Sequence, residues 1–155
     1  MVSGERIEAL ADVAEILTSS QPAQHRLSFL LKHARELLDL DELWLLARDR
    51  SSGGRLTRAA RARRSNAVPR SDTDEAALAA PWLERWDRCE PEDPQPTPGT
   101  VLLPVRVHGV VQGVLVGHTA GAPLSGEDLA TLRAYAALAA PLVVSLRGEE
   151  EAGRS

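Results

Sequence analysis

The sequence contains few cysteines and few aromatic residues, and both shortages exclude classes of protein. Cys89 is the only cysteine among 155 residues, so no internal disulfide can form and a reducing, cytoplasmic location is expected. Aromatic residues make up 3% of the chain, which argues against the stacking platforms that bind single-stranded nucleic acid. The chain is therefore not a disulfide-stabilised miniprotein, and nucleic acid is a disfavoured partner.

The chain also lacks a strong net charge and a long uninterrupted apolar run. With no run of about 20 consecutive apolar residues, no membrane span is expected, and the opening MVSGERIEAL does not have the pattern of a secretory signal. The formal net charge of -4 is too small to demand a partner of either sign. Composition predicts one globular domain over residues 1–155, with a core over 5–147 and a polar, frayed tail over 148–155.

Apolar spacing predicts helices near both ends of the chain. Residues 5–18 and 23–38 carry apolar side chains at the period of a helix with a buried face. Near the C-terminus, Ser125 and Asp128 have the spacing of a capping box that begins a last helix. Pro141 lies within the apolar pattern of that helix, so a kink or a short final segment is expected.

Two pairs of apolar segments predict four strands. Residues 42–48 (ELWLLAR) form a buried strand, and residues 55–64 form its weaker partner after a glycine-rich turn. Residues 101–108 and 110–116, joined at Gly109, form a hairpin.

The segment between the two strand pairs contains a helix and an extended loop. Residues 74–89 have helical spacing, with a break expected at Pro81, and the four prolines of residues 90–99 (EPEDPQPTPG) predict a surface loop. The predicted order is α-α-β-β-α-β-β-α, an α+β arrangement with a mostly antiparallel sheet.

The predicted hairpin and last helix resemble the C-terminal half of a GAF domain. The matching stretches are LLPVRVHGVVQGVLVG and PLSGEDLATLRAYAALAA, while ALADVAEIL and DELWLLARD resemble the N-terminal half. The resemblance implies a GAF-like, PAS-related antiparallel sheet of five or six strands. It places the first and last helices on one face, and the middle helix and loops around a small-molecule pocket on the other. It also implies a sensory or regulatory domain of signal transduction, commonly homodimeric.

Departures from the family pattern narrow the expected function. Cyclic-nucleotide-binding members carry an Asn-Lys pair where this chain has Gly117-His118, and bilin-binding members carry a Cys-His pair where Glu90 follows Cys89. Members that reduce free methionine sulfoxide need a second thiol to resolve a sulfenic acid. We therefore expect a non-enzymatic domain without metal or cofactor, and a sulfoxide-reductase-like enzyme on the same fold is the disfavoured alternative.

Four residues are candidates for contacting a ligand. Trp82 and Trp86 face alike on the helix that would cover the pocket, and indoles suit a planar ligand, although core filling is the favoured interpretation. Arg106 and His108 share one face of the hairpin. There Arg106 would either form an ion pair with an anionic ligand or be exposed to solvent.

The expected partners are a second copy of the chain, an unidentified small molecule and a separate output protein. The broad apolar stripe of the first helix and the alanines of the last helix predict a four-helix bundle between two copies. Residues 48–70 hold eight arginines against one acid, so an adaptor for nucleic acid or an acidic partner is a further alternative. Because residues 71–93 hold eight acids against two arginines, local neutralisation is the favoured interpretation.

Overall fold

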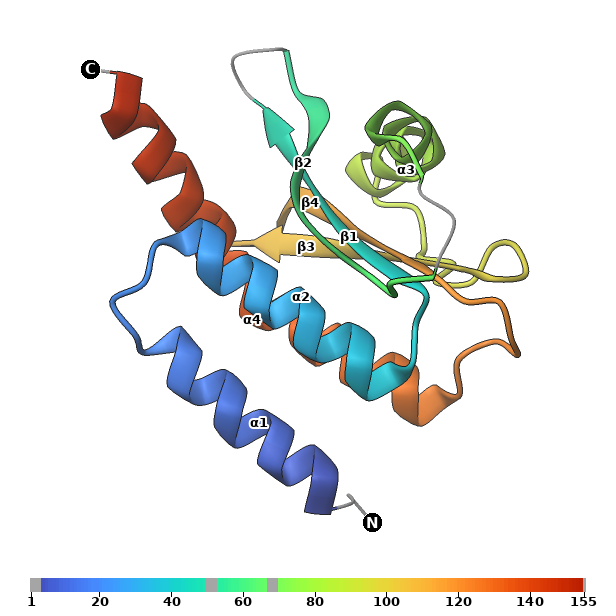
Figure 1. Cartoon of the computed structure of the whole chain (residues 1–155). Coiled ribbons are helices and arrows are strands. Elements are labelled where there is room, and N and C mark those ends of the chain that lie inside the picture. Colours follow the sequence, from blue (N-terminus) through green and yellow to red (C-terminus); the bar gives the residue numbers. More distant parts are fainter. Residues whose placement is uncertain (1–3, 50–52, 67–69, 155) are drawn as a thin grey trace.

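The computed structural model describes residues 4–49, 53–66 and 70–154, and its elements follow the predicted order. They are α1 (Gly4–Leu17), α2 (Ala23–Leu38), β1 (Glu42–Asp49), β2 (Arg55–Arg63), α3 (Asp72–Asp87), β3 (Thr100–Val107), β4 (Val110–His118) and α4 (Gly126–Arg154). The strands form an antiparallel sheet of order β2-β1-β4-β3 (Figure 1). The α+β prediction is confirmed.

The sheet of the described residues has four strands, rather than the five or six that the GAF resemblance implies. The proline-rich loop 90–99 runs beside edge strand β3 without becoming a strand, because proline has no amide hydrogen to donate. It contributes an isolated bridge between Thr97 and Thr100 and a hydrogen bond from Leu102 N to Pro94 O of 2.8 Å. The loop therefore covers part of an edge that would otherwise be open to another chain.

Helices cover both faces of the sheet. α2 packs on β1 and β2, α4 packs beside it on β3 and β4, and α3 lies on the opposite face (Figure 1). α1 lies on the same side as α4 but contacts α2 instead of the sheet, so it forms an outer layer. The helix that packs beside α4 on the sheet is therefore α2, and not the first helix as the GAF resemblance implies.

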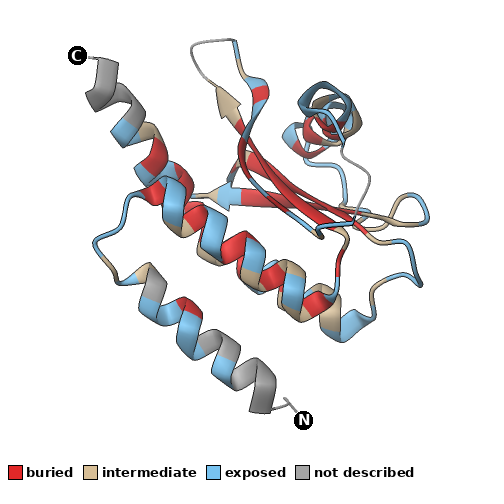
Figure 2. Ribbon diagram, in the orientation of Figure 1, coloured by how far each residue is buried: buried red, intermediate tan, exposed pale blue. Residues whose placement is uncertain are grey.

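The two layers bury side chains of alternating direction along β1. Leu43 and Leu45 belong to the core under α2 and α4, whereas Trp44 and Leu46 belong to the core under α3, as the period of a strand requires. Figure 2 shows the buried residues concentrated in the sheet and on the sheet-facing sides of α2 and α4. Because both faces are covered, β1 has the continuous apolar sequence that predicted a buried strand.

The start of α4 matches expectation, whereas α3 continues through Pro81, where the sequence predicts a break. Ser125 Oγ accepts a hydrogen bond from Asp128 N at 3.1 Å, which confirms half of the predicted capping box. Both helices continue through their prolines: α3 through Pro81, and α4 through Pro141 to a length of 29 residues. A proline removes one helical hydrogen bond, and the buried residues on both sides of it keep the helix packed on the sheet.

The polar residues 148–154 are helical rather than frayed, since α4 ends at Arg154; Ser155 lies outside the described residues. Glu149 gives this extension a function in packing. Its carboxylate oxygens accept hydrogen bonds from Ala23 N at 3.0 and 3.2 Å. The residue before α2 is Pro22, whose side chain offers no capping atom, so the C-terminal helix caps the N-terminus of α2.

The segment Gly126–Glu149 is long and apolar enough to cross a membrane by length and composition, judged over a window of 18 residues. Scattered polar residues interrupt this segment, so it does not form the uninterrupted apolar run of about 20 residues that a membrane span requires. In the structure 44% of that window is buried, against α2 and the sheet. Packing in the core therefore accounts for part of the apolar composition of this helix.

Replacing Glu149 by alanine should lower the free energy of unfolding by about 1 kcal/mol, because Ala23 N–H loses its acceptor at the helix N-terminus. Urea denaturation followed by circular dichroism measures the change. Glu84→Ala on the exposed side of α3 is the matched control and should change stability by less than about 0.5 kcal/mol. Equal losses in the two variants would contradict the capping role.

Candidate ligand-binding site

The two tryptophans of α3 have different environments. Their ring centroids lie 6.5 Å apart, but Trp86 is 3% exposed and packs against the sheet. Trp82 is half-buried, and the guanidinium of Arg85 lies 4.5 Å from its ring centroid. Trp86 therefore fills the core, whereas Trp82 lies at its margin under a cation–π contact.

Apolar side chains fill the space between α3 and the sheet, where the GAF resemblance places a pocket. The buried members of this layer are Trp44, Leu46, Leu56, Ala79, Leu83, Trp86, Leu102, Val111, Val114 and Val116. Cavities open at its rim. One of about 370 Å³ is lined in part by Trp86, Cys89 and Arg106, and one of about 550 Å³ in part by Arg48 and Asp87, which form an ion pair.

The structure therefore brings only two of the four predicted residues, Trp86 and Arg106, to one cavity. Trp82 and His108 are not among the residues that line it. His108 lies in the turn after β3 with φ of 51°, followed by Gly109 with φ of 80°. Two positive φ angles are typical of the tight turn that joins hairpin strands, and this conformation removes His108 from the strand face that it was expected to share with Arg106.

Arg106 forms an ion pair with Glu92 of the proline-rich loop. Its Nη2 donates a hydrogen bond of 3.2 Å to Glu92 Oε1, and Arg133 Nη1 of α4 donates one of 2.6 Å to Glu92 Oε2. Burial by itself raises the pKa of Glu92, but the hydrogen bonds and positive charges of Arg133 and Arg106 outweigh it and hold the pKa below its ordinary value. The Glu92 carboxylate thus links the loop to β3 and α4.

This ion pair predicts a pH-dependent contribution to stability. A lowered carboxyl pKa stabilises the fold above the ordinary value of 4.5, and that contribution is lost as the pH falls through the lowered pKa. Glu92→Gln should therefore cost about 0.5–1 kcal/mol at pH 7, and the difference from wild type should shrink below pH 4.5. Thermal unfolding at several pH values measures it, and a difference that grows on acidification would contradict the assignment.

Sequence reasoning missed a buried polar cluster at the other end of the α3 layer. Glu42 begins β1, Glu75 lies in the first turn of α3 and His118 ends β4, and all three are buried. Glu75 resembled an ordinary acid at a helix start, and His118 an ordinary surface histidine. One signal was available, since Glu42 is two residues before Trp44 and so shares its strand face.

The cluster is connected by short polar contacts. His118 Nε2 lies 2.7 Å from Glu75 Oε2, and Trp44 Nε1 donates a hydrogen bond of 3.5 Å to Glu42 Oε2. Arg70 enters from the loop before α3, with its Nε 3.6 Å from Glu42 Oε2 and its Nη1 3.8 Å from Glu75 Oε1. Glu75 therefore joins α3 to the end of β4 through a buried contact with His118.

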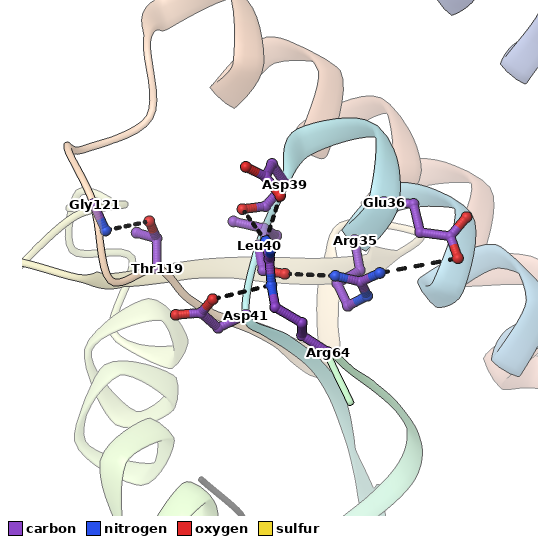
Figure 3. Close-up of polar contacts among 8 residues, drawn as sticks. All are labelled: Arg35, Glu36, Asp39, Leu40, Asp41, Arg64, Thr119 and Gly121. Atoms are coloured by element: carbon purple, nitrogen blue, oxygen red, sulfur yellow. Dashed lines mark hydrogen bonds and ion pairs between the residues drawn. The ribbon is translucent and has the colours of Figure 1, made fainter. Parts of the chain in front are cut away.

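A second charged cluster lies where α2 turns into β1. Arg64 forms ion pairs with Asp39 and with Asp41, the latter at 3.3 Å, and Arg35 Nη1 donates a hydrogen bond of 2.8 Å to Leu40 O (Figure 3). Asp39 has φ of 52°, so the backbone turns sharply there. These contacts stabilise the turn, and Asp39, Asp41 and Arg64 form part of the lining of an open cavity of about 410 Å³.

Several arginines of the basic segment pair with nearby acids, as local neutralisation predicts. Pairs with the acidic segment are Arg48–Asp87, Arg58–Asp72 at 3.7 Å and Arg70–Glu75 at 3.8 Å. Arg61 instead lies over the Trp44 ring, 5.2 Å from its centroid. These contacts account for much of the positive charge without any external partner.

Comparison with known proteins supports the fold. No protein-family model and no curated protein sequence matches the chain. The GAF domain of an Acinetobacter phosphoenolpyruvate-protein phosphotransferase is similar in structure, with TM-score 0.66 and 13% identity over 95% of this chain and 97% of that one. The GAF domain of the Escherichia coli potassium sensor histidine kinase KdpD has TM-score 0.63 and 14% identity over 93% and 96%.

An enzyme shares the same architecture. The type II free methionine-R-sulfoxide reductase of Thermoplasma acidophilum has TM-score 0.55 and 20% identity over 78% of this chain and 92% of that one. The chain therefore has the GAF fold. At these identities the likeness establishes the fold alone.

The placement of the tryptophans predicts unequal costs of truncation. Trp86→Ala should destabilise the domain by about 3–5 kcal/mol, because it leaves a cavity under α3. Trp82→Ala is the matched control and should cost about 1 kcal/mol or less. Denaturant titration measures both, and a Trp86→Ala variant as stable as Trp82→Ala would contradict the core role of Trp86.

Proposed function

We propose that the chain is a non-enzymatic sensory or regulatory domain that works as a homodimer through α1 and α4 and binds a small molecule on its α3 side. The observation that carries this proposal is an apolar stripe on the solvent side of α4, in a domain whose fold is that of GAF sensor modules. The supporting structural neighbours include a domain of a sensor histidine kinase.

The stripe on α4 has the spacing of a helix–helix interface. Its exposed members are Ala130, Ala134, Ala137, Pro141 and Val144, which follow one another at intervals of four and three residues. That alternation places them on one side of the helix, as in the seam of a helical bundle. Val144 is 48% exposed, and the small side chains elsewhere in the stripe would let a second helix approach closely.

α1 extends the same side of the molecule. It contacts α2 through buried Val13 and half-buried Leu17, while Ala11 and Ala14 remain exposed. A helix held by one neighbour buries less of its apolar surface than a helix between two layers. Pairing α1 and α4 with their copies would cover both surfaces in a four-helix bundle.

A charge placed in the stripe tests the dimer. The wild type should sediment as a dimer at tens of micromolar, and Ala134→Glu should weaken the dimer at least tenfold, since it would place a carboxylate in the apolar interface. Ala80→Glu on the exposed side of α3 is the matched control and should leave the dimer unchanged. A monomeric wild type would refute the proposed assembly.

The likeness to a sulfoxide reductase raises the enzymatic alternative. Cys89 is exposed and lies beside the cavity with Trp86 and Arg106. A thiol that reduced a sulfoxide would be left as a sulfenic acid, which needs a second thiol for its return to the reduced state.

Because we propose a non-enzymatic domain, we expect no turnover of free methionine sulfoxide even with dithiothreitol, a dithiol that could itself reduce a sulfenic acid in place of the missing second thiol. Formation of methionine, followed by chromatography, measures it. Cys89→Ser is the control, and turnover present in the wild type but lost in that variant would establish the enzyme instead.

A further inference from the structure

Glu42 and Glu75 are buried carboxylates, and that of Glu42 lacks a full set of partners. The Glu42 side chain is 2% exposed and that of Glu75 is 1% exposed. Glu75 has a close contact with His118, but Glu42 Oε1 and His118 Nδ1 are buried atoms with no hydrogen-bond partner among the described residues. Burying a carboxylate without such partners is costly, so this cluster can accept a hydrogen-bond donor of positive charge.

Arg70 supplies that charge in the observed structure, and it does so loosely. Its distances of 3.6 Å to Glu42 and 3.8 Å to Glu75 are ion-pair distances that exceed hydrogen-bond length. The Arg70 side chain is 50% exposed, in contrast to the carboxylates that it approaches. A guanidinium thus lies at the entrance of an acidic site without forming the short, charge-assisted hydrogen bonds that a guanidinium and two carboxylates can make.

We propose that Glu42 and Glu75 form a binding site for the guanidinium group of a small-molecule ligand, and that the Arg70 side chain occupies this site until the ligand displaces it. The planar donor fork of a guanidinium matches two carboxylates better than the point charge of an ammonium group. This inference deepens the proposed sensory function, on which it rests, by naming the chemical class of the ligand.

Displacement of Arg70 provides a path from the ligand to the fold. Arg70 immediately precedes Ser71, whose Oγ caps α3 by accepting a hydrogen bond from Asp74 N at 3.1 Å. Glu75 in the first turn of α3 contacts both Arg70 and His118. A ligand in the site would therefore act on the start of α3 and on its contact with β4.

Arg70→Ala tests the site with methylguanidinium as the probe. The indole N–H of Trp44 reports on the site, because it donates to Glu42, and its signal in ¹H–¹⁵N spectra can be followed during titration at constant ionic strength. In the wild type the tethered Arg70 competes at an effective concentration on the order of millimolar. We expect saturable binding to Arg70→Ala and at least tenfold weaker binding to the wild type.

Two further variants make the test specific. Adding Glu42→Gln to Arg70→Ala should abolish the saturable shift, whereas Arg55→Ala, which removes an exposed arginine at the far end of β2 from Glu42, should titrate like the wild type. Arg70→Gln keeps the polar character of the side chain and replaces Arg70→Ala if the alanine variant does not fold by circular dichroism. Methylammonium in place of methylguanidinium should bind Arg70→Ala at least threefold more weakly.

The proposal is overturned if the folded Arg70 variant shows no saturable shift, if Glu42→Gln leaves the shift intact, or if methylammonium binds as tightly as methylguanidinium. Sedimentation of the wild type tests the proposed dimer independently of this titration. If the protein is a dimer that does not bind guanidinium, only the proposed class of ligand is refuted. If it is a monomer that binds guanidinium, only the proposed homodimer is refuted.

Discussion

Burial of β1 on both faces is the constraint on which the rest of the structure depends. Six consecutive residues, Glu42–Ala47, are buried, so their side chains need cover above and below the sheet. α2 and α4 supply one cover and α3 supplies the other. The two layers and the central place of β1 beside β4 follow from this requirement.

The same constraint explains why polar contacts gather at the ends of the strands. A carboxylate at the start of β1 lies inside the α3 layer, where water is largely excluded and partners must come from the protein. His118 on β4, Glu75 on α3 and Arg70 before α3 meet there. At the adjoining α2–β1 turn, Arg64 pairs with Asp39 and Asp41. Ion pairs thus hold the connecting segments, while apolar packing holds the layers.

The candidate site shows how far residue patterns could lead. Trp82 and Trp86 were correctly placed on the helix that covers the α3 side of the sheet, because their spacing of four residues is helical. Their unequal burial was not predictable, because it depends on which side of α3 meets the sheet. Arg106 was expected to face a ligand or solvent; it is exposed, and it also pairs with Glu92, fourteen residues earlier. That pairing depends on the path of the proline-rich loop, which could not be predicted because the loop has no regular secondary structure.

Local patterns alone determined the element order, the hairpin at Gly109, the cap at Ser125 and the α+β class. These features depend on nearest neighbours and on the alternation of apolar residues, which the sequence displays directly. Tertiary structure alone decided that α2 lies beside α4, that Glu149 caps α2 and that Glu42 lies within reach of Glu75 and Arg70. Such contacts join residues distant in the chain, and the physical reason is that only the packed layers bring them together and exclude water from the groups between them.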